Sequence, residues 1–325
     1  MSTTTPPLTA AASIEVVKPG ALTTIQDLGR TGYQNAGIPG GGAMDRLALR
    51  VANLLVGNTE NTAALETTMS GPVLLFTADA LVAVCGAKYK GVASWQPFVV
   101  KSGEMLSLSE LETGCRGYIA IAGGLAVKPV LGGAGTFLRA GFGGFEGRAL
   151  QAGDKLSVGP TTKALLDAAE HWRVSTSLLP AYSTGPVVRV TRGAQWGWFS
   201  ENTQSRFLEE KFEVQPKSDR MGLRLSGLPL ELAAPRELAS EAVAFGSVQV
   251  PPDGQPIVLM ADRQTIGGYP KIGDVITMDL PLLAQLRPGD RVMFTSVSVE
   301  DAQALYLAEE HALAKLHEGL AGKLR

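Results

Sequence analysis

Ser70-Gly71-Pro72-Val73-Leu74 is the stretch that favours one fold over others, because a similar stretch, Ser226-Gly227-Leu228-Pro229-Leu230, occurs in the second half of the chain. Two more pairs of similar stretches occur in the same order in the two halves: 16–20 with 188–193, and 152–156 with 288–292. Such order predicts a duplicated β-barrel-like unit, with a cleft where the two copies meet. The alternative is chance repetition of residues that are common in turns.

Short apolar runs bounded by turn residues dominate the chain and predict strands. The clearest runs are 72–76, 81–85, 98–100, 105–108 and 118–122. Residues 101–104 (Lys-Ser-Gly-Glu) predict a hairpin turn between two of them. The 38 glycines suit a protein with many turns. The sequence therefore predicts a mainly β protein.

Helices are few in this prediction. Apolar residues recur at helical spacing from Met44 to Leu55, and Ser298 with Asp301 resembles a capping box before residues 302–316. A short helix is expected at 161–169. The predicted organisation is a disordered tail (1–13), a first barrel (14–160), a linker (161–186), a second barrel (187–297) and a C-terminal helix (298–325).

Composition excludes several classes of function. A length of 325 residues favours two domains, and a net charge of -2 gives no reason to expect nucleic acid or an anionic membrane as partner. No run reaches the roughly 18 apolar residues that a membrane span needs. The two cysteines, Cys85 and Cys115, form no CxxC pattern, and Cys85 lies in an apolar run, so a buried thiol and a cytoplasmic protein are expected.

The stretch Asp262-Arg263-Gln264-Thr265-Ile266-Gly267-Gly268-Tyr269-Pro270 follows the apolar run 256–261. A strand is predicted to deliver polar side chains to a rim, where the two glycines let the backbone approach a ligand. Loops of this kind on a rigid sheet often carry binding residues. The alternative is a tight hairpin whose polar residues face water.

A second polar stretch includes Gln26, Asp27 and Arg30, and glycines 40–42 lead from it into the helix at Met44. A carboxylate beside a guanidinium suits a carboxylate or amide ligand. Backbone N–H groups at the helix start could hold an anion or an oxyanion. The alternative is an Asp–Arg pair that ties down a loop.

Two weaker signals complete the candidate sites. The glycine-rich segment 131–150 fits neither GxGxxG nor a P-loop, and predicts a mobile lid or an irregular loop. Asp219 and Arg220 form another acid–arginine pair, for which a salt-bridged turn is the alternative.

Several motifs are absent from the sequence. The three histidines lack metal-ligand spacing, so no metal site is predicted, and there is no GxSxG. Neither a Walker A motif nor an Ala-Met-Lys-Met biotin attachment site occurs. If the reaction uses ATP or biotin, another polypeptide is expected to bring it.

The polar stretches resemble the KipA family, whose other names are PxpC (the C subunit of 5-oxoprolinase), allophanate hydrolase subunit 2-like and biotin-dependent carboxyltransferase-like. The resemblance is carried, in order along the chain, by residues 26–33, 37–45, 52–58, 65–68, 71–72, 219–225, 247–251 and 262–270. One departure is Gly133 and Gly135, where the family usually has serine. If those hydroxyls contact substrate in relatives, specificity differs in this chain.

The resemblance implies a pair of cyclophilin-like β-barrels. It also implies two partner polypeptides, one KipI-like and one LamB/YcsF-like, with which members open 5-oxoproline to glutamate using ATP. In that case this chain is an amidohydrolase subunit that is inactive alone. One alternative is the carboxyltransferase part of a biotin-dependent urea carboxylase. Another is a non-catalytic regulator that binds a KipI-like kinase inhibitor.

Side-chain chemistry and the resemblance together nominate the site residues. Arg30 or Arg220 is expected to bind the substrate carboxylate, and Asp45 or Asp262 to handle protons. These four are the catalytic candidates. The candidates for substrate binding are Gln26, Asp27, Asn53, Glu66, Asp219, Gln264, Thr265, Gly267, Gly268 and Tyr269.

Overall fold

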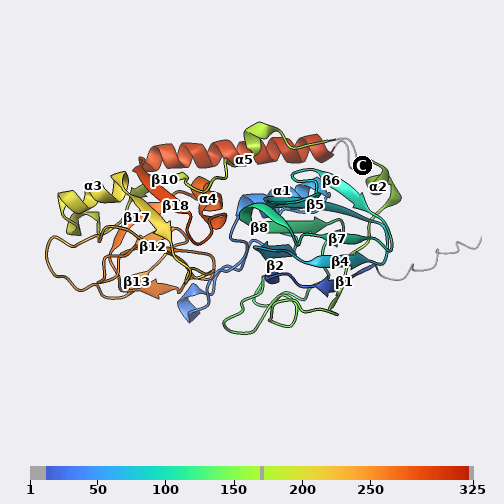
Figure 1. Ribbon diagram of the computed structural model, residues 1–325, viewed down its shortest axis with the longest axis horizontal. Coiled ribbons are helices and arrows are strands. Elements are labelled where there is room, and N and C mark those ends of the chain that lie inside the picture. Colours follow the sequence, from blue (N-terminus) through green and yellow to red (C-terminus); the bar gives the residue numbers. More distant parts are fainter. Residues whose placement is uncertain (1–11, 169–171, 322–325) are drawn as a thin grey trace, which may run out of the picture.

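The computed structural model describes residues 12–168 and 172–321. Two β-rich halves lie side by side, and a long helix, α5 (Val299–Ala321), runs along one side of both (Figure 1). Strands β1–β9 belong to the first half and β10–β18 to the second. The predicted mainly β class, with few helices and a C-terminal helix, is confirmed. Of the predicted tail, residues 1–11 lie outside the described residues, and Ser13 begins β1 (Ser13–Lys18).

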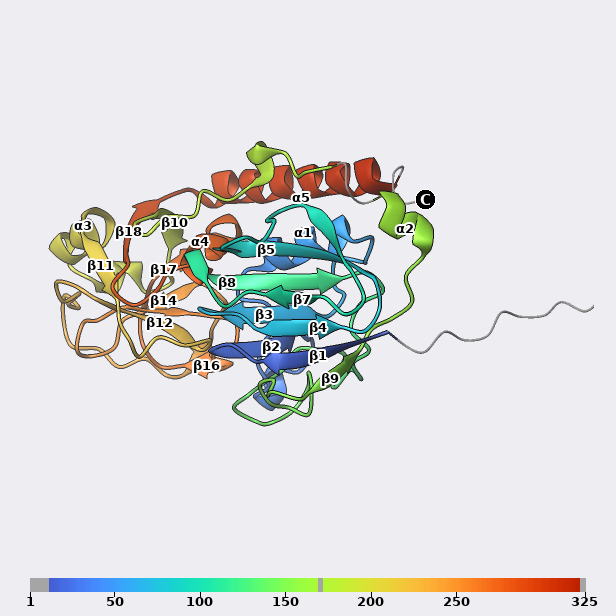
Figure 2. The same cartoon turned by 45° about the vertical axis from the view of Figure 1, so that its right-hand side comes forward.

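The first half consists of two antiparallel sheets with an apolar core between them (Figure 2). One sheet has the order β7-β4-β1-β9 and the other β2-β3-β8-β5-β6. Val16 and Leu74 from the first sheet pack in one buried cluster with Val84 and Ile119 from the second. The remaining strands are β2 (Leu22–Gln26), β3 (Ala64–Thr68), β4 (Val73–Phe76), β5 (Ala80–Tyr89), β6 (Pro97–Val100), β7 (Met105–Ser107), β8 (Leu111–Ile121) and β9 (Lys155–Ser157).

A loop closes the first half beside the edge strand β2. The backbone N–H groups of Thr136 and Leu150 donate to the carbonyls of Ile25 and Thr23 at 2.8 and 2.9 Å. The strands of this half therefore form two sheets joined by the loop rather than one continuous ring. In segment 131–150, Gly132, Gly141, Gly143, Gly144 and Gly147 have positive φ, which prevents a regular strand.

The second half is a closed barrel of seven strands, in the order β10-β17-β14-β15-β12-β11-β18. Its core contains Phe207, Phe212 and Phe294, and the rings of Phe207 and Phe294 stack at 4.7 Å between centroids. A separate pair, β13 with β16, lies outside the barrel order. The strands are β10 (Val187–Arg192), β11 (Lys211–Val214), β12 (Gly222–Ser226), β13 (Glu241–Ala242), β14 (Ser247–Gln249), β15 (Ile257–Leu259), β16 (Ile266–Gly267), β17 (Lys271–Val275) and β18 (Arg291–Ser296).

Capping residues define where the helices begin. Asp45 accepts from the N–H of Ala48 at the start of α1 (Arg46–Leu55), and Ser298 accepts from the N–H of Asp301 before α5. The remaining helices are α2 (Lys163–Ala168), α3 (Glu201–Glu209) and α4 (Leu280–Ala284), with single 3-10 turns at η1 (Gln34–Ala36), η3 (Thr176–Leu178), η4 (Trp196–Trp198) and η5 (Thr277–Asp279). None of the helices in the described ranges is long and apolar enough to cross a membrane.

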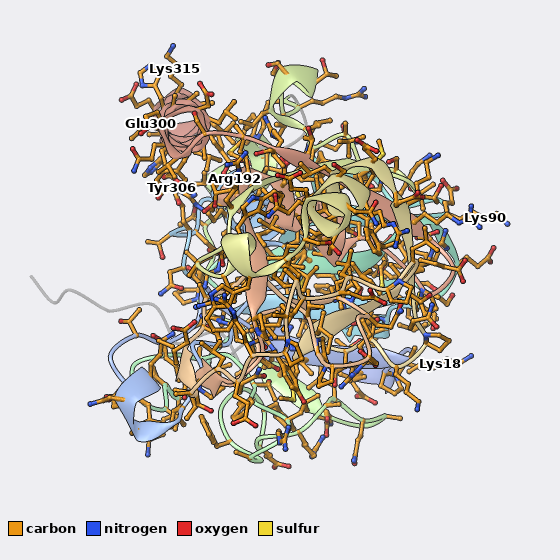
Figure 3. The ribbon with its side chains drawn as sticks, turned by 90° about the vertical axis from the view of Figure 1, so that its left-hand side faces the viewer. Lys18, Lys90, Arg192, Glu300, Tyr306 and Lys315 are labelled. Carbon is orange, nitrogen blue, oxygen red and sulfur yellow. The ribbon has the colours of Figure 1, made fainter. Side chains whose placement is uncertain are left out.

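Helix α5 joins the two halves on their outer side. Arg50 of α1 forms a two-pronged ion pair with Glu310 of α5, with N–O distances of 2.6 and 2.7 Å, and Leu313 is fully buried in the cluster around α1. Figure 3 shows α5 nearly end-on, with Glu300, Tyr306 and Lys315 around it. The helix therefore adds a second apolar layer outside the five-stranded sheet of the first half.

Hydrogen bonds show which parts of the two halves correspond. The turn at Gly153 exchanges backbone hydrogen bonds with Val16 of β1, and the turn at Gly289 does the same with Val214 of β11. The similar turns 152–156 and 288–292 thus occupy equivalent places. The strand equivalent to β1 is however β11, and the predicted match of 16–20 with 188–193 is wrong, because β10 pairs with β18 in parallel whereas β1 pairs with β9 antiparallel.

Candidate functional site

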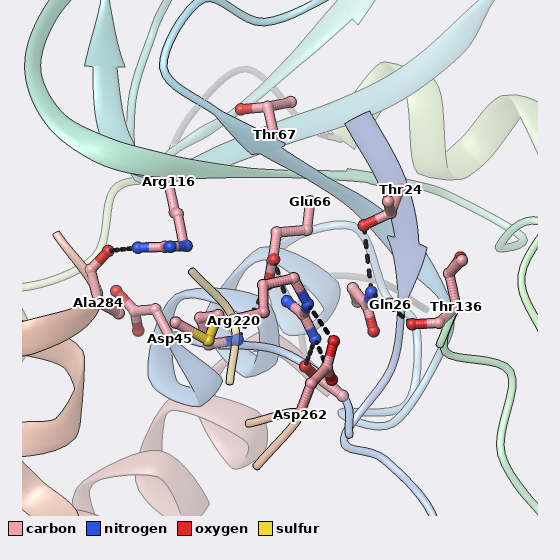
Figure 4. Close-up of polar contacts among 12 residues, drawn as sticks. Thr24, Gln26, Asp45, Glu66, Thr67, Arg116, Thr136, Arg220, Asp262 and Ala284 are labelled. Atoms are coloured by element: carbon pink, nitrogen blue, oxygen red, sulfur yellow. Dashed lines mark hydrogen bonds and ion pairs between the residues drawn. The ribbon is translucent and has the colours of Figure 1, made fainter. Parts of the chain in front are cut away.

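A buried ion cluster lies where the two halves meet. Arg220, before β12, donates from Nε and Nη2 to Asp262, which follows β15, at 2.8 and 3.0 Å (Figure 4). Its Nη1 donates to Glu66 of β3 in the first half, and its Nη2 also donates to the carbonyl of Gly42 at 2.6 Å. None of the three charged residues is more than 6% exposed. The structure therefore brings three predicted site residues together from both halves.

The opposite charges in this cluster stabilise one another in their ionised forms. Burial by itself lowers the pKa of Arg220, but Asp262 and Glu66 outweigh that effect and raise it above the ordinary value. Glu66 uses its second oxygen to accept from the N–H of Met44 at 2.9 Å and from the hydroxyl of Tyr118 at 2.7 Å. A buried ion pair satisfied in this way fixes geometry, and removal of one member would leave uncompensated charge.

Asp45 lies close to this cluster and has a structural role in the chain. Its Oδ1 accepts from the N–H of Ala48 at 2.9 Å, and its Oδ2 accepts from the Tyr182 hydroxyl at 2.5 Å and from Nε2 of Gln285 at 3.0 Å. Burial raises the pKa of Asp45, while these three hydrogen bonds act in the opposite direction. The carboxylate therefore ties α1 to the linker and to the second half.

Arg30 and Gln26 each carry a buried atom without a hydrogen-bond partner. Arg30 donates from Nη2 to the carbonyl of Gly135 at 2.5 Å, but its Nη1 has no partner. Gln26 donates from Nε2 to Thr24 Oγ1 and to the carbonyl of Thr136, both at 3.1 Å, but its Oε1 has no partner (Figure 4). Buried unpaired donors and acceptors cost about 1–3 kcal/mol each, so these two groups are the strongest indication of a ligand site.

Glycines allow the backbone to approach these two atoms closely. A Cβ at Gly135 would lie 2.8 Å from Oε1 of Gln26 and 3.0 Å from Oδ1 of Asp27. A Cβ at Gly41 would lie 3.3 Å from Nη1 of Arg30 and 3.6 Å from Oδ1 of Asp262. A serine at 135 would place its side chain against Gln26, so the residue at this position sets the neighbourhood of the unpaired oxygen. At Gly133 a Cβ would instead meet the Cβ of Arg30 at 3.2 Å.

Asp27 holds the loops around this space. Its Oδ1 accepts from the N–H of Gly29 at 2.8 Å and its Oδ2 from the N–H of Ala134 at 2.6 Å. Burial lowers the pKa of Arg30, and the carboxylates of Asp27 and Asp262 offset part of that decrease. Asp27 therefore ties the loop after β2 to segment 131–150.

Other predicted site residues lie elsewhere. Asn53 donates to the carbonyl of Thr62 at 2.8 Å and holds the loop after α1, and the exposed Asp219 accepts from the N–H of Met221 at 2.8 Å in a turn. After Asp262 the 262–270 stretch turns outward. Its later residues, Gln264, Thr265, Gly267, Gly268 and Tyr269, lie in and around the β13–β16 pair, and Tyr269 is 44% exposed.

Three residues of the polar network are not among the predicted site residues. Tyr118 stands at the start of an apolar run, and Tyr182 and Gln285 lie outside the polar stretches. Gln285 accepts from the backbone N–H groups of Cys115 and Arg116, both at 2.9 Å. The sequence feature that could have pointed to these three residues is a hydroxyl or amide side chain within an apolar run. In the described residues no three His, Cys, Asp or Glu side chains are placed to hold a metal ion.

Buried polar groups lie where the two β-rich units meet, and Nη1 of Arg30, Oε1 of Gln26 and Nε of Arg116 are among the buried atoms without a hydrogen-bond partner. Contacts between domains are places where small-molecule sites commonly occur. Residues 36–296 match the family model "Carboxyltransferase domain, subdomain A and B". The chain belongs to this family.

The similar proteins fall into two groups. The chain is 41% identical to the C subunit of 5-oxoprolinase from Haemophilus influenzae, over 90% of this chain and 94% of the relative. It is 39% identical to the Escherichia coli protein of the same name, over 89% and 93% of the two chains. The solved structure of K. lactis urea amidolyase is similar with a TM-score of 0.87 and 31% identity, covering 96% of this chain and 20% of that one.

Proposed function

We propose that this chain is the C subunit of an ATP-dependent, cytoplasmic 5-oxoprolinase and that it binds the lactam of 5-oxoproline. A KipI-like partner and a LamB/YcsF-like partner would complete the enzyme. The observation that carries the proposal is the pair of unpaired buried atoms, Nη1 of Arg30 and Oε1 of Gln26. The two relatives that match over nearly their whole length, both named as the C subunit of 5-oxoprolinase, support it.

A lactam presents a carbonyl oxygen and an N–H on the same edge. Arg30 would donate to the oxygen and Gln26 would accept from the N–H, so both unpaired groups would gain partners. In hydrolysis, water adds to the carbonyl carbon, the C–N bond breaks, and the nitrogen takes up a proton to give glutamate. The cation of Arg30 would stabilise the negative charge that develops on the oxygen.

The carboxylates of this chain are poor candidates for the base in that reaction. Both oxygens of Asp27, Asp45 and Asp262 already accept hydrogen bonds within the chain. Asp45 in particular is fully buried as a helix cap. We therefore assign binding and polarisation to this chain and proton transfer to a partner polypeptide. ATP is assigned to the assembled complex, since this chain has no Walker A motif.

The test is reconstitution of the full chain with its KipI-like and LamB/YcsF-like partners, followed by assay of glutamate release from 5-oxoproline and ATP. Arg30→Met is expected to lower kcat/KM by about 10²-fold or more, by analogy with removal of an oxyanion donor. Gln26→Met is expected to lower it by about tenfold, as for loss of one hydrogen bond. Gln204→Met is the matched control, because Gln204 also donates to two acceptors, the carbonyls of Trp196 and Phe199, but in the second half. Wild-type rates in both Met variants of Arg30 and Gln26 would remove these residues from the site.

The second candidate is carboxyl transfer to urea, supported by the TM-score of 0.87 to urea amidolyase. Biotin would then come from another polypeptide. Biotin-dependent consumption of urea by the reconstituted system, without glutamate release, would favour this candidate. Tight binding of a KipI-like protein with neither activity would favour the regulatory alternative.

A further inference from the structure

A cavity of about 360 Å³ lies where α1, α4 and α5 come together. Helix α1 belongs to the first half and α4 to the second, so the cavity lies at a contact between the halves. Much of its wall is apolar or aromatic, formed by Leu28, Met44, Leu47, Phe245, Leu280 and Pro281. Ligand pockets of about 300–1,000 Å³ typically combine such an apolar wall, a place between domains and a few polar groups.

Five residues with charged side chains are among those that line the cavity, and three of the five pair with one another. Arg50 pairs with Glu60 and with Glu310, at 2.6 Å in each case. The other two are Arg46, the first residue of α1, and Glu309 of α5. Neither forms a hydrogen bond or an ion pair with a residue that the structure describes. One base and one acid therefore line the same cavity without pairing.

Neighbouring charges compensate these two groups only in part. Burial is the main cause of a lowered pKa of Arg46, and Asp27 acts in the opposite direction. Both oxygens of Asp27 already accept from backbone N–H groups. Burial likewise raises the pKa of Glu309 to about 7, although the charge of Arg50 opposes this increase. Each group has thus lost hydration without gaining a partner, which a ligand of the opposite charge would supply.

We propose that this cavity binds a zwitterion: an α-amino acid with an apolar side chain, whose ammonium group contacts Glu309 and whose carboxylate contacts Arg46. A guanidinium group matches a carboxylate through paired N–H donors, and a carboxylate accepts from an ammonium group. The apolar wall would contact the side chain of the ligand. Neither Arg30 nor Gln26 lines the cavity, so the inference does not depend on the lactam reaction.

The experiment is isothermal titration of the full chain with L-leucine and with two analogues that each lack one charge, 3-methylbutylamine and 4-methylpentanoate. Leucine is expected to bind, and each analogue to bind at least about tenfold more weakly, as for loss of a charge-assisted contact. Arg46→Gln and Glu309→Gln should each weaken leucine binding by a similar factor. The analogues test the proposal on the wild-type chain, whatever the folding of the variants.

Proton release gives a second readout. An ammonium ion favours the ionised form of Glu309, so leucine binding near pH 7 should release part of a proton. The heat of binding should then depend on the ionisation enthalpy of the buffer. Glu309→Gln should remove this dependence, whereas a merely structural role of Glu309 would leave it unchanged.

Two variants outside the cavity are matched controls. Glu300→Gln changes an acid on α5, and Arg192→Gln changes an arginine whose Cζ lies 5.2 Å from the centroid of the Trp196 ring, as that of Arg46 lies 5.7 Å from Phe245 (Figure 3). Both should bind leucine as wild type does. The proposal is overturned if leucine does not bind, if either analogue binds as tightly as leucine, if both cavity variants bind as wild type does, or if the controls weaken binding equally.

Discussion

In the second half every strand of the barrel has a neighbour on both sides, and β10 closes the ring by pairing with β17 and β18. In the first half β2 and β9 are edges of different sheets, and segment 131–150 runs beside β2 in place of a strand. The unpaired atoms of Gln26 and Arg30 lie beside this loop. The half that is closed by a loop thus carries the candidate ligand groups, and the closed barrel supplies the fixed ion pair of Arg220 and Asp262.

The apolar cores of the two halves also differ. The barrel has one main apolar cluster, whereas the five-stranded sheet of the first half is covered on both faces, by the second sheet and by α1 with α5. This explains why β5 is buried at nearly every position. Burial on both faces produces continuous apolar runs without alternation.

Loss of the cation between the halves is expected to have the largest effect. Arg220→Leu leaves Glu66 and Asp262 buried without a countercharge and should lower the free energy of unfolding by about 3–5 kcal/mol. Urea unfolding measures this. The control is Arg291→Leu, whose ion pair with Glu213 at 3.7 Å is exposed and should contribute less than about 1 kcal/mol. Equal losses in the two variants would mean that the buried cluster does not hold the halves together.

The loop between β2 and α1 offers a sharper comparison within the first half. Gly42 has φ +82, and an added Cβ would lie 2.5 to 2.8 Å from backbone atoms of Gly29, Leu28 and Asp27. Gly42→Ala should cost more than about 2 kcal/mol, from backbone strain and the clash together. Gly37→Ala, at φ +77 with nothing within 4 Å, should cost only about 1 kcal/mol. Thermal melts of both variants test this, and indistinguishable melts would contradict it.

Gly135 tests whether the loop-closed edge is where the ligand binds. Ser at 135 would place a hydroxyl donor against Oε1 of Gln26, so Gly135→Ser should lower kcat/KM of the reconstituted complex by about tenfold, as for loss of one hydrogen bond. Because the added Cβ would lie 2.8 Å from Oε1 of Gln26 and 3.0 Å from Oδ1 of Asp27, thermal unfolding of the variant is measured as well, and activity is compared at a temperature where the variant is folded. Gly197→Ser, in the second half with nothing within 4 Å of its added Cβ, is the control. Unchanged activity of Gly135→Ser would show that Oε1 of Gln26 does not contact the substrate.

The smallest effect on stability is expected from the titration of Glu309 on α5, the helix that spans both halves. Burial raises the pKa of Glu309 to about 7 in the folded protein, above its ordinary value of 4.5. The stability that this group contributes is therefore complete below about pH 4.5 and is lost as pH rises through about 7. Because Glu309 is partly exposed, the loss should be about 1 kcal/mol. Glu309→Gln should remove this part of the pH dependence of thermal unfolding, whereas Glu300→Gln, in the exposed first turn, should keep it.

Helices, strands and turns that are determined by residues close together in the sequence could be predicted. Apolar spacing indicated α1, and Ser298 with Asp301 indicated the start of α5. The strands β4 to β8 and the turn between β6 and β7 also agree with the predicted runs, with β5 and β8 longer than expected. Caps, turns and periodicity are properties of short segments, which is why they can be read locally.

Contacts between distant segments could not be predicted in this way. Glu66 and Arg220 are 154 residues apart, and Asp45 and Gln285 are 240 apart. No spacing rule relates such positions. Gln285 fits against β8 only because Gly114 and Gly86 lack side chains, since a Cβ there would lie 2.7 and 3.2 Å from its amide atoms. The resemblance indicated which polar stretches to examine, and the roles assigned to them stay predictions.

The hydrogen bonds of Asp45 and Gln285 have a consequence for biosynthesis. Asp45 and the backbone N–H groups of Cys115 and Arg116 emerge from the ribosome well before their partners Tyr182 and Gln285. The first half therefore cannot satisfy its own buried polar groups while it is being made, although domains commonly fold in order from the N-terminus. We expect a nascent chain that stops before residue 285 to be cut by protease within the first half faster than the full chain. Completion of the first half would then wait for the last quarter of translation.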